Sequence, residues 1–373
     1  MQTVGQSWLV LELTNSPFKL GLVAALQWMP MLFLSFVGGA LADRMAKRRL
    51  IIGTQTALLI QAFVLSALVW SGHVRYWHVA ALACLLGIVN TADIPARQSF
   101  IVEMVGPEDL INGIALNSAA FNAARVVGPA VAGLLIARFG IAPAFFLNGL
   151  SFLAVIGALL AVRAEGLPRP RRGTTMVQEI GEGIRYVVAS PRVSLILSLV
   201  LAISIFVINY GVMVPLLARD VLHQDAHGFG LLLAAIGAGA MAGAVALAFL
   251  GQGRPPMSLA VVPAILISAA TLSLAGIRAF WPAAGVLVLV GLCHTLFLGS
   301  CNTTLQLSAP GELRGRVMGL YAFVFSGVTP IGAFLMGSLA ETFGVPAAYA
   351  AGGGLGLLSA VALVAAWRYR RTR

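Results

Sequence analysis

Eleven apolar runs, each long enough to cross a lipid bilayer as a helix, are the strongest constraint on the fold of this chain. They cover residues 18–42, 50–70, 77–97, 111–137, 141–162, 193–217, 228–250, 258–278, 281–302, 316–338 and 345–367. A helix of roughly 20 apolar residues spans the hydrocarbon core, and in lipid each backbone N–H and C=O needs an internal partner. The runs therefore predict an all-α integral membrane protein with eleven complete transmembrane helices.

Composition agrees with this class and argues against two others. The chain is 59% hydrophobic and 10% charged, with a mean hydropathy of +0.93. Its net charge of +11 comes from cations in short loops between apolar runs, so we expect no nucleic-acid partner. The three cysteines lie inside apolar runs without Cys-x-x-Cys spacing, and we expect no disulfide, metal or cofactor.

A shorter apolar piece precedes the first complete run. Residues 8–13 are apolar except for Glu12, and the turn signal TNSP follows at 14–17, which predicts the end of a partial first helix. No Lys or Arg precedes Lys19, so a signal peptide is not indicated. A half-helix that begins at bilayer depth would leave a charged amine in lipid. We therefore expect a misplaced or shortened start in preference to a chain with eleven and a half helices.

Basic residues predict the orientation. Of the 24 cations, 18 fall in one set of alternate loops and five in the other. Because Lys and Arg concentrate on the cytoplasmic side, this bias predicts a multi-pass protein whose C-terminus is cytoplasmic.

The chain also repeats itself at a shift of 204 positions. The shift superimposes Gly87 on Gly291, Thr91 on Thr295, Gly133 on Gly337, Phe139-Gly140 on Phe343-Gly344 and Gly149 on Gly353. This spacing predicts two homologous helical bundles, residues 1–162 and 193–373, joined by a linker over 163–192.

The linker contains a candidate amphipathic helix. Apolar residues recur at helical spacing opposite charged ones, namely Ile180, Ile184, Val187 and Val188 against Glu179, Glu182 and Arg185. We expect a helix along the cytoplasmic surface. The alternative is a solvated tether.

Three motifs resemble a known superfamily. The charged stretch GALADRMAKRR at 39–49, between two apolar runs, is similar to the loop motif of the major facilitator superfamily of secondary transporters. The segment ARVVGPAVAG at 124–133 resembles the fifth-helix signature of its proton-coupled efflux branch, and DIPARQ at 93–98 resembles the enterobactin-exporter-like group. The resemblance implies twelve helices in two pseudo-symmetric bundles that alternate access to a central site.

The resemblance also implies a conformational latch. It assigns Gly39, Asp43 and Arg44 to that role, with the start of the eleventh helix at Gly315-Arg316 as the partner. Asp43 can accept hydrogen bonds from a helix N-terminus, where the macrodipole is positive. The sequence departs from the motif at Ala46, Ala124 and Ala132, where the pattern has glycine. Without a latch, the charges would only enforce topology, which is all we expect of Lys47, Arg48 and Arg49.

Ionisable residues inside spans are costly and so tend to be functional. Asp93 and Arg125 are the clear cases; Asn90 and Arg97 share a helix face with Asp93, and Asn122 shares one with Arg125. Our hypothesis is that Asp93 pairs with Arg125 or Arg97 and that its protonation couples proton entry to substrate exit. A permanently ionised bridge between two helices is the alternative.

Other polar residues lie on helices that line the central cavity in the superfamily. The candidates for substrate contact are Asn90, Asn122, Asn209, Tyr210, His294 and Asn302. A single histidine in a span is more often a packing residue than a proton carrier. Gly128, Pro129 and Gly133 are expected to shape helix packing.

Enzyme motifs are absent from the sequence. There is no Gly-Lys-Ser/Thr phosphate loop and no His-Glu-x-x-His. We therefore expect that transport is either driven by an ion gradient or has no energy source. We expect a monomeric secondary transporter in a bacterial-type inner membrane that exports an organic small molecule by proton antiport. The alternatives are an importer of the same fold and a truncated, non-transporting membrane protein.

Overall fold

The computed structural model describes residues 1–105, 109–162, 176–250 and 255–372, and this part of the chain is helical without strands. The N-terminal bundle consists of α1 (Gln2–Thr14), α2 (Pro17–Arg44), α3 (Lys47–Trp70), α4 (Tyr76–Val105), α5 (Leu110–Phe139) and α6 (Ile141–Ala161). A separate helix, α7 (Met176–Ala189), follows. The C-terminal bundle consists of α8 (Pro191–Phe206), α9 (Tyr210–Leu216), η1 (Leu217–Val221), α10 (Ala226–Leu250), α11 (Ser258–Ser273), α12 (Phe280–Ser308), α13 (Gly311–Ala322), η2 (Phe323–Gly327), α14 (Thr329–Phe343) and α15 (Val345–Thr372), where η1 and η2 are π-helical turns.

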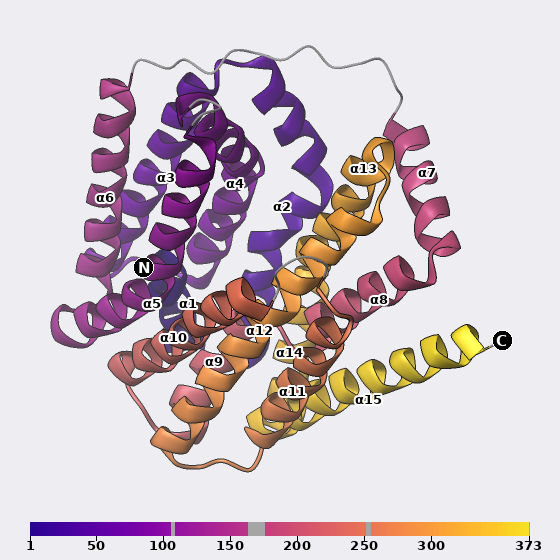
Figure 1. Ribbon diagram of the computed structural model, residues 1–373. Coiled ribbons are helices and arrows are strands. Elements are labelled where there is room, and N and C mark those ends of the chain that lie inside the picture. The colour runs from indigo at the N-terminus through magenta and orange to yellow at the C-terminus, as the bar shows by residue number, and fades with distance from the viewer. Residues whose placement is uncertain (106–108, 163–175, 251–254, 373) are drawn as a thin grey trace.

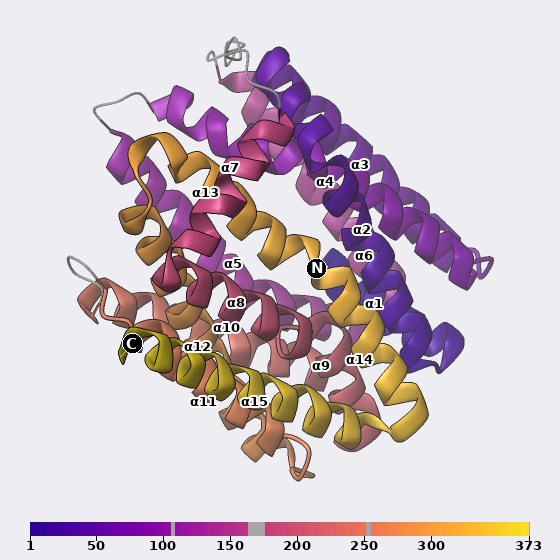
Figure 2. The same ribbon diagram turned by 90° about the vertical axis from the view of Figure 1, so that its right-hand side faces the viewer.

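The two bundles lie side by side, as Figures 1 and 2 show from perpendicular directions. We call the end of the molecule that carries the α2–α3 loop, the end of α6 and the start of α7 the linker end; it is at the top of Figure 1. The turns at 14–17, 70–76, 139–141 and 343–345 lie at the opposite end. The predicted all-α, two-bundle fold is therefore confirmed.

Membrane-spanning capacity follows from length and apolarity. Nine helical stretches in the described residues are long and apolar enough to cross a bilayer, and Val126–Phe139 and Ser258–Ser273 are shorter apolar helices. Exposed aromatic residues gather at the opposite end: Trp70, Trp77, Phe139, Trp281 and Phe343. Aromatic side chains at this level are typical of a membrane–water interface.

Glycines related by the shift of 204 occupy matching places in the two bundles. A Cβ added to Gly87 on α4 would lie 2.0 Å from the carbonyl oxygen of Gln27 on α2, and one added to Gly291 on α12 would lie 2.0 Å from that of Ile236 on α10. Gly140 and Gly344 both have φ +85° at the turns before α6 and α15. The repeat in the sequence thus corresponds to repeated helix crossings and turns.

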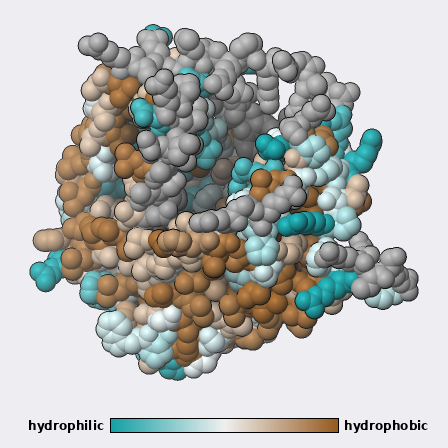
Figure 3. All heavy atoms as spheres, in the orientation of Figure 1, coloured by the Kyte–Doolittle hydropathy of each residue, from teal (hydrophilic) through white to brown (hydrophobic). Residues whose placement is uncertain are grey.

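Glycines also bring the two bundles together at the opposite end. A Cβ on Gly133 of α5 would lie 2.8 Å from the Cα of Gly230 on α10, and one on Gly21 of α2 would lie 3.0 Å from the Cα of Gly337 on α14. Small residues let helix backbones approach this closely. Toward the linker end the bundles separate, and Figure 3 shows the molecule hollowed between them there.

The predicted runs at 193–217 and 316–338 lie within the candidate spans Pro191–Val221 and Leu313–Phe343, and each span contains an irregular turn. The first is irregular between α8 and α9, where the N–H groups of Val207 and Ile208 both donate to the Ile203 carbonyl at 2.9 Å. The second consists of α13, η2 and α14, with Pro330 near the start of α14. Proline has no N–H and cannot continue the hydrogen-bond ladder.

The predicted linker helix forms as α7 and contacts the C-terminal bundle. The Tyr186 hydroxyl donates to the Ser308 carbonyl at 2.7 Å, and Glu182 forms an ion pair with Arg316 on α13. Ile184 and Val188 remain exposed on its surface.

Candidate functional site

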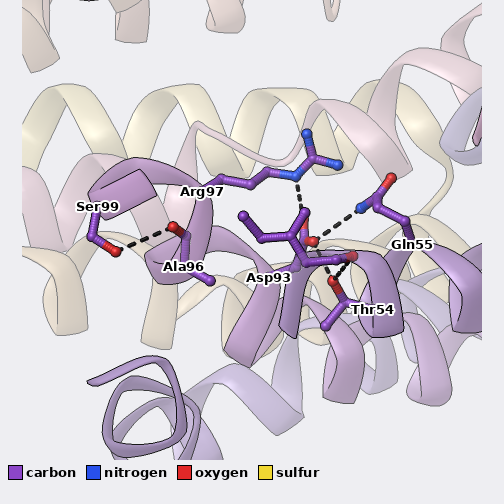
Figure 4. A network of polar contacts seen from close by, with 7 residues as sticks. Thr54, Gln55, Asp93, Ala96, Arg97 and Ser99 are labelled. Carbon is purple, nitrogen blue, oxygen red and sulfur yellow. Dashed lines mark hydrogen bonds and ion pairs between the residues drawn. The ribbon is translucent and has the colours of Figure 1, made fainter. Parts of the chain in front are cut away.

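A buried carboxylate on α4 is the centre of the polar network in Figure 4. Asp93 is 5% exposed. Its Oδ1 accepts hydrogen bonds from Thr54 Oγ1 at 2.6 Å and Gln55 Nε2 at 2.9 Å, both on α3. Its Oδ2 accepts from Arg97 Nε at 2.7 Å, one turn further along α4. The three donors satisfy an ionised carboxylate that the surrounding helices shield from water.

Arg97 and Asp93 meet because residues four apart lie on the same helix face. The Arg97 side chain is 41% exposed, so its charge keeps contact with solvent while that of Asp93 does not. Of the two predicted partners, the structure places Arg97 beside Asp93. The side chains of the other candidate, Arg125, and of Asn122 lie outside the described part of the chain. Asn90 is half-buried one turn before Asp93 on α4.

The Thr54 hydroxyl has two acceptors within reach but one hydrogen. It lies 2.6 Å from Asp93 Oδ1 and 2.9 Å from the Ile51 carbonyl oxygen. When Asp93 is ionised, the hydroxyl donates to the carboxylate. When Asp93 is protonated, the hydroxyl can donate to Ile51 and accept from the carboxyl group. The site therefore offers hydrogen bonds to both protonation states of Asp93.

Two predicted residues in the C-terminal bundle form a second polar contact. Tyr210 on α9 lies with its hydroxyl 3.1 Å from His294 Nδ1 on α12, and His294 is buried. Next to this contact is a cavity of about 10 Å³, lined among others by Tyr210, Met213 and Tyr349. That volume admits about one water molecule, so it does not hold an organic substrate.

The remaining polar candidates also have hydrogen-bond partners. Asn209 Nδ2 donates to the Ile205 carbonyl at 2.7 Å where α8 ends, and Asn302 Oδ1 accepts from Gln306 Nε2 at 2.5 Å. Of the predicted packing residues, Gly133 contacts α10, the Pro129 carbonyl oxygen would lie 2.6 Å from a Cβ on Gly230, and Gly128 faces open space.

The predicted latch residues are not brought together by any described contact. Arg44 is exposed at the end of α2, while the side chain of Asp43 and the surroundings of Gly39 lie outside the description. Arg316 contacts Glu182 of α7. In this conformation, Arg316 is therefore engaged by the linker helix.

Two cations at the start of α3 do more than set topology, which corrects our expectation for Lys47 and Arg48. Lys47 is 2% exposed and its Nζ lies 2.7 Å from Glu103 Oε1, at the linker end of α4. Arg48 donates to the carbonyls of Leu159 and Leu160 at 2.7 and 2.8 Å. A cation suits the negative C-terminal end of α6. Glu103, the first acid after the apolar run at 77–97, was the available sequence signal.

Together, the helical bundles, the close crossings and the buried intramembrane carboxylate define a multi-pass transport protein of the membrane. The model of the family described as "transmembrane secretion effector" matches residues 1–373. The chain belongs to this family, a branch of the major facilitator superfamily, and is a transporter rather than an enzyme.

Two of the curated relatives are exporters of different kinds. The chain is 30% identical over 361 residues to the multidrug efflux pump Tap of Mycobacterium tuberculosis, covering 92% of this chain and 84% of the relative. It is 29% identical over 371 residues to the enterobactin exporter EntS of Shigella boydii, covering 96% and 87%. These relatives support an exporter in a bacterial membrane.

Solved structures share the fold. The nucleoside transporter NupG matches with a TM-score of 0.76 at 11% identity, over 97% of this chain and 93% of that one. A peptide transporter of the POT type matches with a TM-score of 0.75 at 15% identity, over 97% and 90%. At these identities the likeness concerns the fold alone.

Proposed function

We propose that this chain exports an organic small molecule, drug-like or siderophore-like, by proton antiport with alternating access. The observation that carries the coupling is Asp93, a buried carboxylate in a membrane-spanning helix whose neighbours fit both of its protonation states. The names of the relatives, a multidrug pump and a siderophore exporter, support the substrate class.

In this proposal the proton and the substrate use the same conformational cycle. Protonation removes the charge of Asp93 and frees Arg97 from its ion pair, and the Thr54 hydroxyl turns toward Ile51. Release of the proton restores all three bonds to the carboxylate. The charge on α4 thus changes each time Asp93 binds or releases a proton. Through this change the proton gradient can shift the equilibrium between the two arrangements of the bundles.

Alternating access is supported by where the bundles meet. They touch through glycines at the opposite end and are hollowed at the linker end. The cation bias supports an orientation in which the linker end and the C-terminus face the cytoplasm, with the protein in a bacterial-type inner membrane. The conformation is then open to the cytoplasm, from which an exporter loads its substrate.

The remaining predicted roles stay part of this proposal, with the protein working as a monomer. Substrate contact is assigned to Asn90, Asn122, Asn209, Tyr210, His294 and Asn302. The cytoplasmic latch, which closes when the hollow collapses, is assigned to Gly39, Asp43, Arg44 and Arg316.

Accumulation of labelled substrates in cells tests the proposal. Cells that express the chain are loaded with a catecholate siderophore or a cationic drug, and the retained label is followed against cells with an empty vector. We expect faster loss of label from expressing cells, and slower loss when an uncoupler collapses the proton gradient. Equal retention in both cell types would refute export, and higher retention in expressing cells would indicate an importer.

A further inference from the structure

The turn between α1 and α2 is contacted by charged residues of the other bundle from both sides. α1 ends at Thr14, and Ser16 caps the start of α2 at Pro17. The turn lies at the opposite end of the molecule and belongs to the N-terminal bundle. Its charged neighbours, Glu341 on α14 and Arg219 in η1, belong to the C-terminal bundle.

Glu341 lies at the N-terminus of α2. Its Oε2 accepts hydrogen bonds from Ser16 Oγ at 2.9 Å and from the Phe18 N–H at 3.0 Å. The first N–H groups of a helix have no intrahelical acceptor and carry the positive end of its dipole. Pro17 has no N–H, so the N–H of Phe18 is the first that α2 offers. A carboxylate is therefore well matched to this position.

Arg219 lies at the other side of the turn, at the C-terminus of α1. Its Nη1 donates to the Leu11 carbonyl oxygen at 3.1 Å, while its Nε donates to Asp220 Oδ1 at 2.5 Å. Leu11 is in the last turn of α1, where carbonyl oxygens carry the negative end of the dipole. Asp220 fixes the guanidinium in place. Each helix end at the turn thus meets the charge that its dipole favours.

A neutral contact accompanies these charges deeper in the same interface. Pro215 has no N–H to donate to the carbonyl of Gly211, four residues earlier. The Ser7 hydroxyl of α1 donates to that Gly211 oxygen at 3.2 Å. The N-terminal bundle therefore fills a hydrogen-bond vacancy that proline creates in the C-terminal bundle.

We infer that Glu341 and Arg219 form a clamp that holds the two bundles together at the end of the molecule opposite the linker end. The inference rests on the proposed alternating access, in which this end must open to release substrate. Opening separates the α1–α2 turn from α14 and η1, so both charged contacts break and the charges return to water. Because Glu341 is exposed and Arg219 partly so, each contact biases the equilibrium without locking it.

The distance between the bundles at this end tests the clamp. In a chain with Cys84, Cys293 and Cys301 replaced by serine, spin labels are attached at His73→Cys and Ser273→Cys, on exposed positions of opposite bundles. Pulsed electron resonance in lipid nanodiscs then gives the ratio of open to closed molecules. We expect Glu341→Gln and Arg219→Gln each to raise that ratio roughly two- to five-fold, and the double variant to raise it further.

Matched control variants remove one negative and one positive charge at the same end of the molecule, from residues outside the clamp. Glu12 accepts from Trp8 of its own helix at 2.7 Å, and Arg278 donates to Ala275 and Ile277 of its own loop. Glu12→Gln and Arg278→Gln are therefore expected to keep the wild-type distances. Wild-type distances in the clamp variants, or equal shifts in the controls, would overturn the clamp. A shift in a protein that exports nothing would retain the clamp and refute the proposed substrate transport.

Discussion

At the scale of single residues, burial separates charges that act inside the protein from those that act on its surface. Asp93 and Lys47 are both buried, and both have partners of opposite charge within 2.7 Å. Asp93 has neighbours that suit a neutral form as well, whereas Lys47 is paired with Glu103 at the helix ends. We therefore propose a coupling role for Asp93 and a structural role for Lys47.

The Lys47 assignment predicts a loss of stability. Lys47→Met leaves the Glu103 carboxylate without its ammonium partner, and breaking such a pair costs about 3 kcal/mol of unfolding free energy. The measurement is the midpoint of thermal unfolding in detergent. Arg49→Met removes an exposed cation from the same turn of α3 and should change the midpoint little. If the two variants unfold at the same temperature, the structural role of Lys47 is wrong.

The sequence revealed Asp93 and Arg97 but not their surroundings. A charge in an apolar run stands out in one sequence, and the spacing of four residues predicts the ion pair. Thr54 and Gln55 come from another helix, and which face of α3 meets α4 depends on tertiary packing. The same limit applies to Glu341 and Arg219, whose partners are 323 and 208 positions away.

At the scale of elements, glycines determine how closely helices cross. Gly87→Ala would place a Cβ 2.0 Å from the Gln27 carbonyl oxygen, and Gly291→Ala would do the same against Ile236. Overpacking of this kind costs about 1–3 kcal/mol. We expect both variants to unfold at lower temperature than the parent.

Gly53→Ala is the matched control for both variants, because its Cβ would meet nothing within 4 Å on α3. Helix propensity predicts that this change is neutral or stabilises by up to about 1 kcal/mol. Unfolding of Gly87→Ala at or above the temperature of Gly53→Ala would contradict the close crossing of α2 and α4.

The apolar runs predicted most helices, because length and hydropathy are local properties. The irregular turn at 207–209 was not predicted, because it contains neither glycine nor proline; there the Asn209 side chain donates to the Ile205 carbonyl. The repeat was a better guide, since Gly87 and Gly291 or Gly140 and Gly344 serve the same purpose in each bundle.

At the scale of the whole molecule, the two bundles meet at one end and separate at the other. Glycine crossings and the clamp hold the opposite end, while the hollow faces the linker end. An exporter that alternates between this conformation and one open at the opposite end needs an energy source that changes the relative stability of the two. In our account that source is the proton on Asp93.

Proton-driven flux in liposomes tests this central claim most directly. Purified protein is reconstituted with an acidic interior, and uptake of the substrate identified in cells is followed while protons leave. The account predicts that wild-type protein concentrates substrate inside the liposomes only while the gradient lasts. It also predicts that Asp93→Asn exchanges labelled for unlabelled substrate but does not concentrate it. Equal gradient-driven accumulation by Asp93→Asn and wild type would contradict the account.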